Sequence, residues 1–157
     1  MLAKRLRFVL PLLLFLATVT FIWSNSMMDA ETSSAQSDFV GEIIQEIVDV
    51  EKNPFDYIFE NRRSVAHFVE FALLGASICL FLVLNLPRRL PLYAIGLLAG
   101  FQVAVTDECI QIFVPGRAAE LADLALDCGG IAVGMLCMGL VSFLVLFFKK
   151  KTKKKTA

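Results

Sequence analysis

The sequence predicts an all-α membrane protein in which four transmembrane helices form an antiparallel bundle with an outer amphipathic helix. Two observations support this fold class. Hydrophobic residues make up 57 % of the 157 residues, too large a share for an ordinary soluble domain. They also gather in four apolar runs, each close to or above the ~20 residues that a helix needs to cross a bilayer. Residues 1–157 are therefore expected to form a single membrane domain.

The first apolar run covers residues 8 to 23 and predicts a span at about 6–24. The run is slightly short, so its flanks must reach toward the interface or the bilayer must thin. A basic segment precedes it, as in a signal peptide, which is the alternative interpretation. Residues 24–27 offer no convincing small-residue cleavage site, so we expect the helix to be retained.

The remaining runs predict spans at about 64–86, 91–114 and 120–148. Only a very short loop joins the second span to the third, so these two should form a tight antiparallel pair. Pro115 and Gly116 predict a turn after the third span, because proline presets its first corner and glycine tolerates positive φ at its second. The fourth span is longer than a bilayer requires and is expected to tilt.

An acidic outer loop at 25–63 separates the first two spans. Apolar residues recur at helical spacing over about 38–50, opposite Glu42, Glu46 and Asp49. This pattern predicts an amphipathic helix that lies on the membrane surface or on the ends of the spans. The alternative interpretation is that this helix forms a lid over a functional site.

The distribution of basic residues predicts that both termini are cytoplasmic. In that orientation the inner side carries basic residues and no acid: Lys4, Arg5, Arg7, Arg88, Arg89 and the lysines of the tail at 149–157. Because the tail directly follows an apolar run, it indicates membrane topology rather than a nucleic-acid partner.

Polar side chains inside the spans are the main functional signal, since a charged residue costs ~2.5–3.5 kcal/mol at the centre of a membrane helix. At ~1.5 Å per residue, they all fall in the outer third of a ~30 Å bilayer core or at its edge. Three separate segments therefore place polar groups in one layer. These groups are His67, Glu70, Asp107, Glu108, Gln111, Asp123 and Asp127.

Small residues share helical faces with these acids, and small residues let membrane helices approach closely. The polar groups are therefore expected on the packed side, away from lipid. The glycines on these faces are Gly96, Gly100, Gly130 and Gly134.

Two interpretations of the polar layer stay open: a functional site, or an ion-pair network that fastens the helix ends together. In a functional site, His67 is the acid–base candidate because imidazole titrates near neutral pH. The other catalytic candidates are Glu70, Asp107 and Glu108. The candidates for binding a substrate are Arg63, Gln111, Arg117, Asp123 and Asp127. A divalent cation is a candidate cofactor, although a single histidine argues against zinc.

Two stretches, at 63–71 and 107–117, resemble the VanZ-like family of bacterial membrane proteins, and the second continues to Gly134. Phe71 stands where the family's HFxEY pattern has tyrosine, and Cys109 takes a usually aliphatic position. The family's namesake is associated with low-level resistance to the glycopeptide antibiotic teicoplanin. The resemblance therefore implies a protein of the bacterial cytoplasmic membrane with a role in the cell envelope, without naming a reaction.

Together these features predict an envelope protein that acts on the head group of a lipid or cell-wall precursor at the outer face. The alternative is a non-catalytic accessory protein that binds a lipid, an antibiotic or a partner. The polar groups stop in the outer layer, which argues against a small transporter or channel.

Overall fold

The computed structural model describes residues 2–28, 32, 62–87 and 90–155, and this part of the chain is helical without strands. Its helices are α1 (Leu2–Ser26), α4 (Arg62–Asn85), α5 (Leu90–Gln111) and α6 (Leu121–Lys155). Each is long and apolar enough to cross a membrane. The chain is thus an all-α, multi-pass membrane protein. The amphipathic helix predicted at about 38–50 lies outside the described residues.

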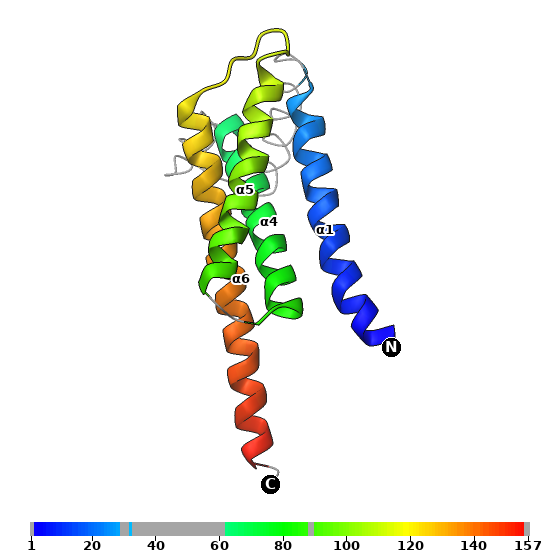
Figure 1. Cartoon of the computed structure of the whole chain (residues 1–157). Coiled ribbons are helices and arrows are strands. Elements are labelled where there is room, and N and C mark those ends of the chain that lie inside the picture. Colours follow the sequence, from blue (N-terminus) through cyan, green and yellow to red (C-terminus); the bar gives the residue numbers. More distant parts are fainter. Residues whose placement is uncertain (1, 29–31, 33–61, 88–89, 156–157) are drawn as a thin grey trace, which may run out of the picture.

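Helices that follow one another in the chain run in opposite directions, and both termini lie at the same end (Figure 1). Near the start of α1, the backbone carbonyl of Arg7 accepts a hydrogen bond from Asn85 at the end of α4. Gly96, early in α5, faces Ile78 and Leu82, late in α4. α4 contacts all three other helices and so forms the centre of the bundle.

The closest contact joins α4 and α6, which run parallel because their residues meet in the same order along both helices. An ideal Cβ on Gly130 would lie 2.5 Å from the carbonyl oxygen of Phe68, and one on Gly134 would overlap that of Ala72. No side chain fits at either position. The prediction that Gly130 and Gly134 face another helix is therefore confirmed, and it explains how the two backbones approach so closely.

A tight turn connects α5 to α6 at Pro115 and Gly116, as predicted. Gly116 has a φ of 76°, and the backbone N–H of Arg117 donates to the carbonyl of Val114 at 3.2 Å. A positive φ at the second corner is the geometry of a type II turn. The turn holds Arg117 at the end of the bundle that is opposite the termini.

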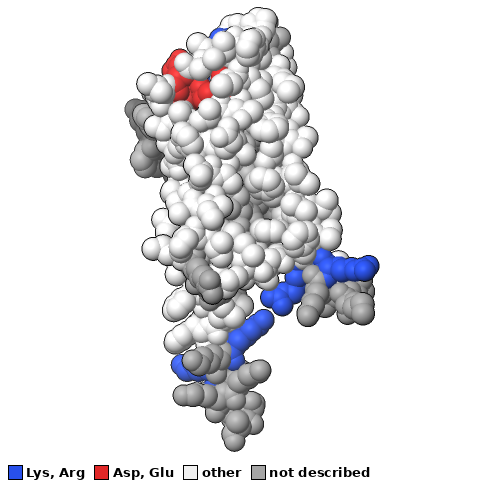
Figure 2. All heavy atoms as spheres, viewed as in Figure 1, with Lys and Arg blue, Asp and Glu red and all other residues white. Residues whose placement is uncertain are grey.

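The charged surface is divided between the two ends of the molecule (Figure 2). Exposed Arg5, Arg7, Lys149 and Lys151 lie at the end that carries the termini, and acidic side chains gather at the other. Between them, the face shown in Figure 2 carries no charged side chain among the described residues. Large apolar side chains are exposed along the helices, as expected for a surface that contacts lipid.

Candidate functional site

Polar side chains from all four described helices meet inside the bundle, at the end opposite the termini. His67 comes from the beginning of α4, Asp107 from the end of α5 and Asp127 from the beginning of α6. Asp107 and Asp127 are 0 % exposed and His67 is 8 % exposed. We call these three residues the central cluster. α1 contributes Ser26, its last residue, which is also buried.

Local sequence explains why these side chains point inward. Asp127 precedes Gly130 and Gly134 on the face of α6 that packs against α4, so its carboxylate is directed into the bundle. The imidazole of His67 stacks on Phe71, one turn later in α4, with ring centroids 6.5 Å apart and 14° between the planes. Phe71 is fully buried, so this contact limits how far the imidazole can turn.

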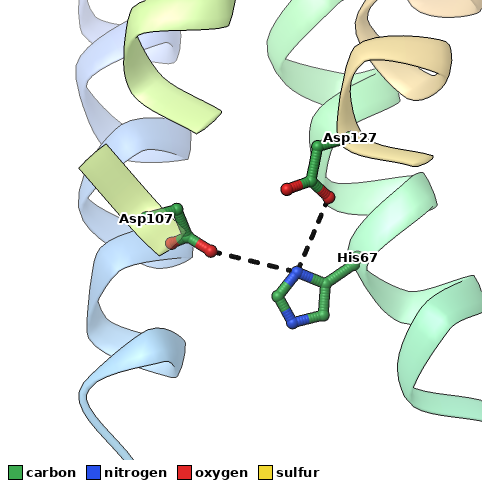
Figure 3. Close-up of side chains that lie close together, drawn as sticks. All are labelled: His67, Asp107 and Asp127. Carbon is green, nitrogen blue, oxygen red and sulfur yellow. Dashed lines mark ion pairs between the residues drawn. The ribbon is translucent and has the colours of Figure 1, made fainter. Parts of the chain in front are cut away.

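The imidazole lies between the two carboxylates of the central cluster (Figure 3). His67 Nδ1 is 3.7 Å from Asp127 Oδ1 and 3.9 Å from Asp107 Oδ2. Both distances exceed the ~2.7–3.2 Å of a hydrogen bond. His67 therefore lies at ion-pair distance from both carboxylates, without a hydrogen bond to either.

Asp107 is the acceptor at the centre of a hydrogen-bond network. Ser26 Oγ donates to its Oδ1 at 2.5 Å, and Gln111 Nε2 donates to its Oδ2 at 3.0 Å. Arg63 Nη2 in turn donates to Gln111 Oε1 at 2.9 Å. The network ties α1, α4 and α5 together and fixes the orientation of the Asp107 carboxylate.

Two other predicted site residues, Glu70 and Glu108, are bonded outside the central cluster. Asn25 Nδ2 donates to Glu70 Oε1 at 2.8 Å, so Glu70 is engaged with α1. The backbone N–H of Glu120 donates to Glu108 Oε2, also at 2.8 Å, and this bond ties the end of α5 to the segment before α6.

Arg117 and Asp123 flank the central cluster. Arg117, half-buried after the turn, lies close enough to Asp107 to interact with it electrostatically. Asp123 is half-buried in the first turn of α6, one turn before Asp127. The predicted site residues thus lie at one end of the bundle, and only three of them form the central cluster.

Asn25 and Ser26 contribute to this network but are not predicted from the sequence. Polar residues at the end of an apolar run look like an ordinary transition from membrane to water. The sequence signal for them is weak, because it consists only of the short polar segment Ser24-Asn25-Ser26 directly after the first apolar run.

A metal ion could be held by the central cluster. His67, Asp107 and Asp127 each offer one ligand atom, and these atoms lie within 4.8 Å of one another. Glu70 and Asp123, which also carry suitable oxygen atoms, are not members of this group.

An apolar groove of about 630 Å³ lies between α5 and α6, away from the central cluster. Tyr93, Leu97, Met135 and Phe143 are among the residues that line it. The groove contains no member of the central cluster, and its walls suit lipid chains rather than polar chemistry.

Comparison with known proteins yields one family. The family model described as VanZ/LLP1 matches residues 8–149, which include parts of all four described helices. No curated protein and no solved structure gives a significant match.

Proposed function

Because this chain belongs to the VanZ/LLP1 family of membrane proteins, we propose that it engages the head group of a lipid or cell-wall precursor at the outer face of the bacterial cytoplasmic membrane. The observation that supports this function is the buried imidazole of His67 between Asp107 and Asp127. Ionisable groups inside a membrane protein are costly and commonly mark functional sites.

The proposal requires the central cluster to lie near the outer leaflet. Exposed basic residues gather at the opposite end, together with both termini (Figure 2). Basic ends of membrane helices stay in the cytoplasm, which supports a cytoplasmic location for both termini.

We predict that a single cysteine added after Ala157 is not labelled from outside the cell, whereas a single cysteine placed within residues 33–37 is labelled. Bilayer-impermeant labelling of single engineered cysteines at these two sites measures the orientation. The four native cysteines are first replaced in the same background. A tail labelled from outside, or a protected loop, contradicts the orientation and with it the outer-facing site.

The residues around the cluster suit an anionic head group. Guanidinium groups bind phosphate and carboxylate through paired hydrogen bonds, and Arg117 lies at this end of the bundle. His67 is the group suited to exchange a proton with a bound molecule. Asp107 and Glu108 would position the head group or a cation next to it.

A second candidate is a non-catalytic accessory protein that holds a lipid, antibiotic or partner without turnover. The hydrogen-bond network from Arg63 through Gln111 to Asp107 favours this candidate, because it occupies these polar groups with one another. In this case the polar end of the bundle is a fixed binding surface.

The test of both candidates uses His67→Ala and Glu108→Gln in a strain whose teicoplanin susceptibility depends on the protein. We expect each variant to reduce resistance to the level of a strain that lacks the protein, with membrane abundance and melting temperature in detergent close to wild type. Glu120→Gln is the matched control, since it removes an exposed acid at the same end of the bundle and should retain resistance.

Wild-type resistance in both variants would exclude the site function. Resistance lost in proportion to stability would show that the cluster is a scaffold, because each change then leaves a buried partner uncompensated. If resistance is lost at normal stability, lipid and precursor turnover in membranes that contain the variants separates catalysis from binding.

A further inference from the structure

We propose that His67, Asp107 and Asp127 form a binding site for a divalent cation of the Mn²⁺ class, at the junction of α4, α5 and α6. This inference goes beyond head-group recognition and does not require it. A cation held by three helices would also connect α6 to α4 and α5. The Asp107 network does not make this connection, because Asp127 on α6 takes no part in it.

The first argument is the spacing of the ligand atoms. His67 Nδ1 lies 3.7 Å from Asp127 Oδ1 and 3.9 Å from Asp107 Oδ2, and all three atoms lie within 4.8 Å of one another. At a metal–ligand distance of ~2.1 Å, two ligands at a tetrahedral angle stand ~3.4 Å apart. The two distances from His67 exceed this value by about 0.3 and 0.5 Å, and the two carboxylates are at most 4.8 Å apart, so side-chain shifts of up to about an ångström would complete the coordination.

The second argument is that two of the three ligand residues have buried ligand atoms with no hydrogen-bond partner among the described residues. This holds for both carboxylate oxygens of Asp127, which is 0 % exposed, and for Nδ1 of His67. Figure 3 shows the imidazole between the Asp127 carboxylate from α6 and the Asp107 carboxylate from α5. A buried polar atom without a hydrogen-bond partner is unfavourable, and a cation between these groups would coordinate Nδ1 of His67 and the carboxylate of Asp127.

The third argument is the support around Asp107. Ser26 and Gln111 each donate to one of its oxygens, at 2.5 Å and 3.0 Å. A carboxylate has about four acceptor positions, so Oδ2 keeps a lone pair for a metal. Hydrogen bonds to a ligating carboxylate are the usual outer shell of metal sites, where they fix its orientation.

Charge also favours a cation. The two carboxylates of the central cluster face each other across a single imidazole, with Glu70 and Glu108 in the same layer. Glu70 is bonded to Asn25 and Glu108 to a backbone N–H, both neutral donors. Arg117 acts on Asp107, and a divalent ion would balance the remaining negative charge around Asp127.

The donor set indicates the class of ion. Ca²⁺ and Mg²⁺ prefer sites made of oxygen ligands alone, and structural zinc sites favour several thiolates or imidazoles. One imidazole nitrogen with two carboxylate oxygens suits Mn²⁺, which accepts both ligand types. Three protein ligands leave coordination positions open for a head-group oxygen, which connects this site to the proposed function without depending on it.

The test relies on the chain having one histidine. The full-length protein is purified in detergent through a tag that lacks histidine, stripped with a chelator and titrated with Mn²⁺. Electron paramagnetic resonance measures free and bound ion. We expect one bound Mn²⁺ per chain, with spin-echo modulation from an imidazole nitrogen that can belong only to His67.

Asp127→Asn and His67→Ala are expected to weaken Mn²⁺ binding at least tenfold, since even outer-shell changes cost ~10- to 100-fold in metal affinity. Glu120→Gln should bind as the wild type does. If Asp127→Asn does not fold, the nitrogen modulation of the wild-type protein decides the question alone.

Folded wild-type protein that binds no Mn²⁺, or binds it without nitrogen modulation, would overturn the site. Unchanged affinity in folded Asp127→Asn would overturn it as well. The measurement involves no cellular phenotype, so the two proposals fail separately: absence of Mn²⁺ binding overturns the ion site alone, and wild-type resistance in His67→Ala and Glu108→Gln excludes head-group recognition alone.

Discussion

Replacing Gly134 with leucine is expected to prevent folded protein from accumulating in the membrane. Gly134 faces the backbone of α4, where even a single Cβ would overlap the Ala72 carbonyl oxygen and lie 2.9 Å from the Ala76 nitrogen. Backbone atoms cannot turn away as a side chain can, so α4 and α6 would have to separate. Membrane abundance and melting temperature in detergent measure the effect.

Alanine at two glycines of the same helix gives the matched comparison. We expect Gly134→Ala to destabilise the protein by at least ~1–3 kcal/mol, the usual range for overpacking a core. At Gly139 the nearest atom to an added Cβ is Cys79 Sγ, at 3.9 Å, which is ordinary contact. Gly139→Ala should therefore be neutral or stabilising, because alanine favours helix formation. Equal tolerance at both positions would contradict the close packing of α4 and α6.

Replacing Asp107 with alanine is expected to cause the second large loss of stability. The change removes the acceptor for Ser26 and for Gln111, and both donors are fully or almost fully buried. Each buried donor left without an acceptor costs ~1–3 kcal/mol, so the total should be roughly 2–6 kcal/mol. Thermal unfolding in detergent, followed by loss of helical circular dichroism, measures this loss.

Ser26→Ala tests the same network from α1. Its hydroxyl donates across helices to Asp107, whereas the hydroxyl of Thr18 donates to Leu14 within α1. Ser26→Ala should therefore destabilise clearly and Thr18→Ala only slightly. In a double-mutant cycle, Ser26→Ala and Asp107→Ala together should cost less than the sum of the single changes. Strictly additive effects would show that the 2.5 Å contact carries no coupling.

Much of the fold follows from the sequence because the bilayer restricts the choices. A membrane helix satisfies its own backbone hydrogen bonds, so apolar run length and turn residues almost determine the helices. Pro115 and Gly116 mark a turn for local reasons, and Gly130 and Gly134 mark a packed face. The parallel contact of α4 with α6 cannot be predicted from the sequence in this way, because loop lengths do not determine which helices pack side by side.

The sequence predicts how deep the site residues lie in the membrane, but not which of their side chains contact each other. Counting residues from the helix ends places His67, Asp107 and Asp127 in one layer, and the structure brings them together. The pair His67 and Glu70 shows where this reasoning fails. Their spacing places them on one face of α4, yet Glu70 bonds to Asn25 of α1. α4 contacts three helices, so a small rotation decides which neighbour each side chain meets.

The position of Ser26 in the chain has a consequence for synthesis. Ser26 and its acceptor Asp107 are 81 residues apart, so at ~5–20 residues per second the ribosome makes the donor roughly 4–16 s before the acceptor exists. Asp127, on the last helix, emerges later still. α1 can already contact α4 during this interval, but its hydrogen bond to Asp107 forms only after α5 has been made. Any protease that removed α1 during this interval would remove the hydrogen bonds that Ser26 and Asn25 donate to Asp107 and Glu70, and of the two donors to Asp107 only Gln111 would remain.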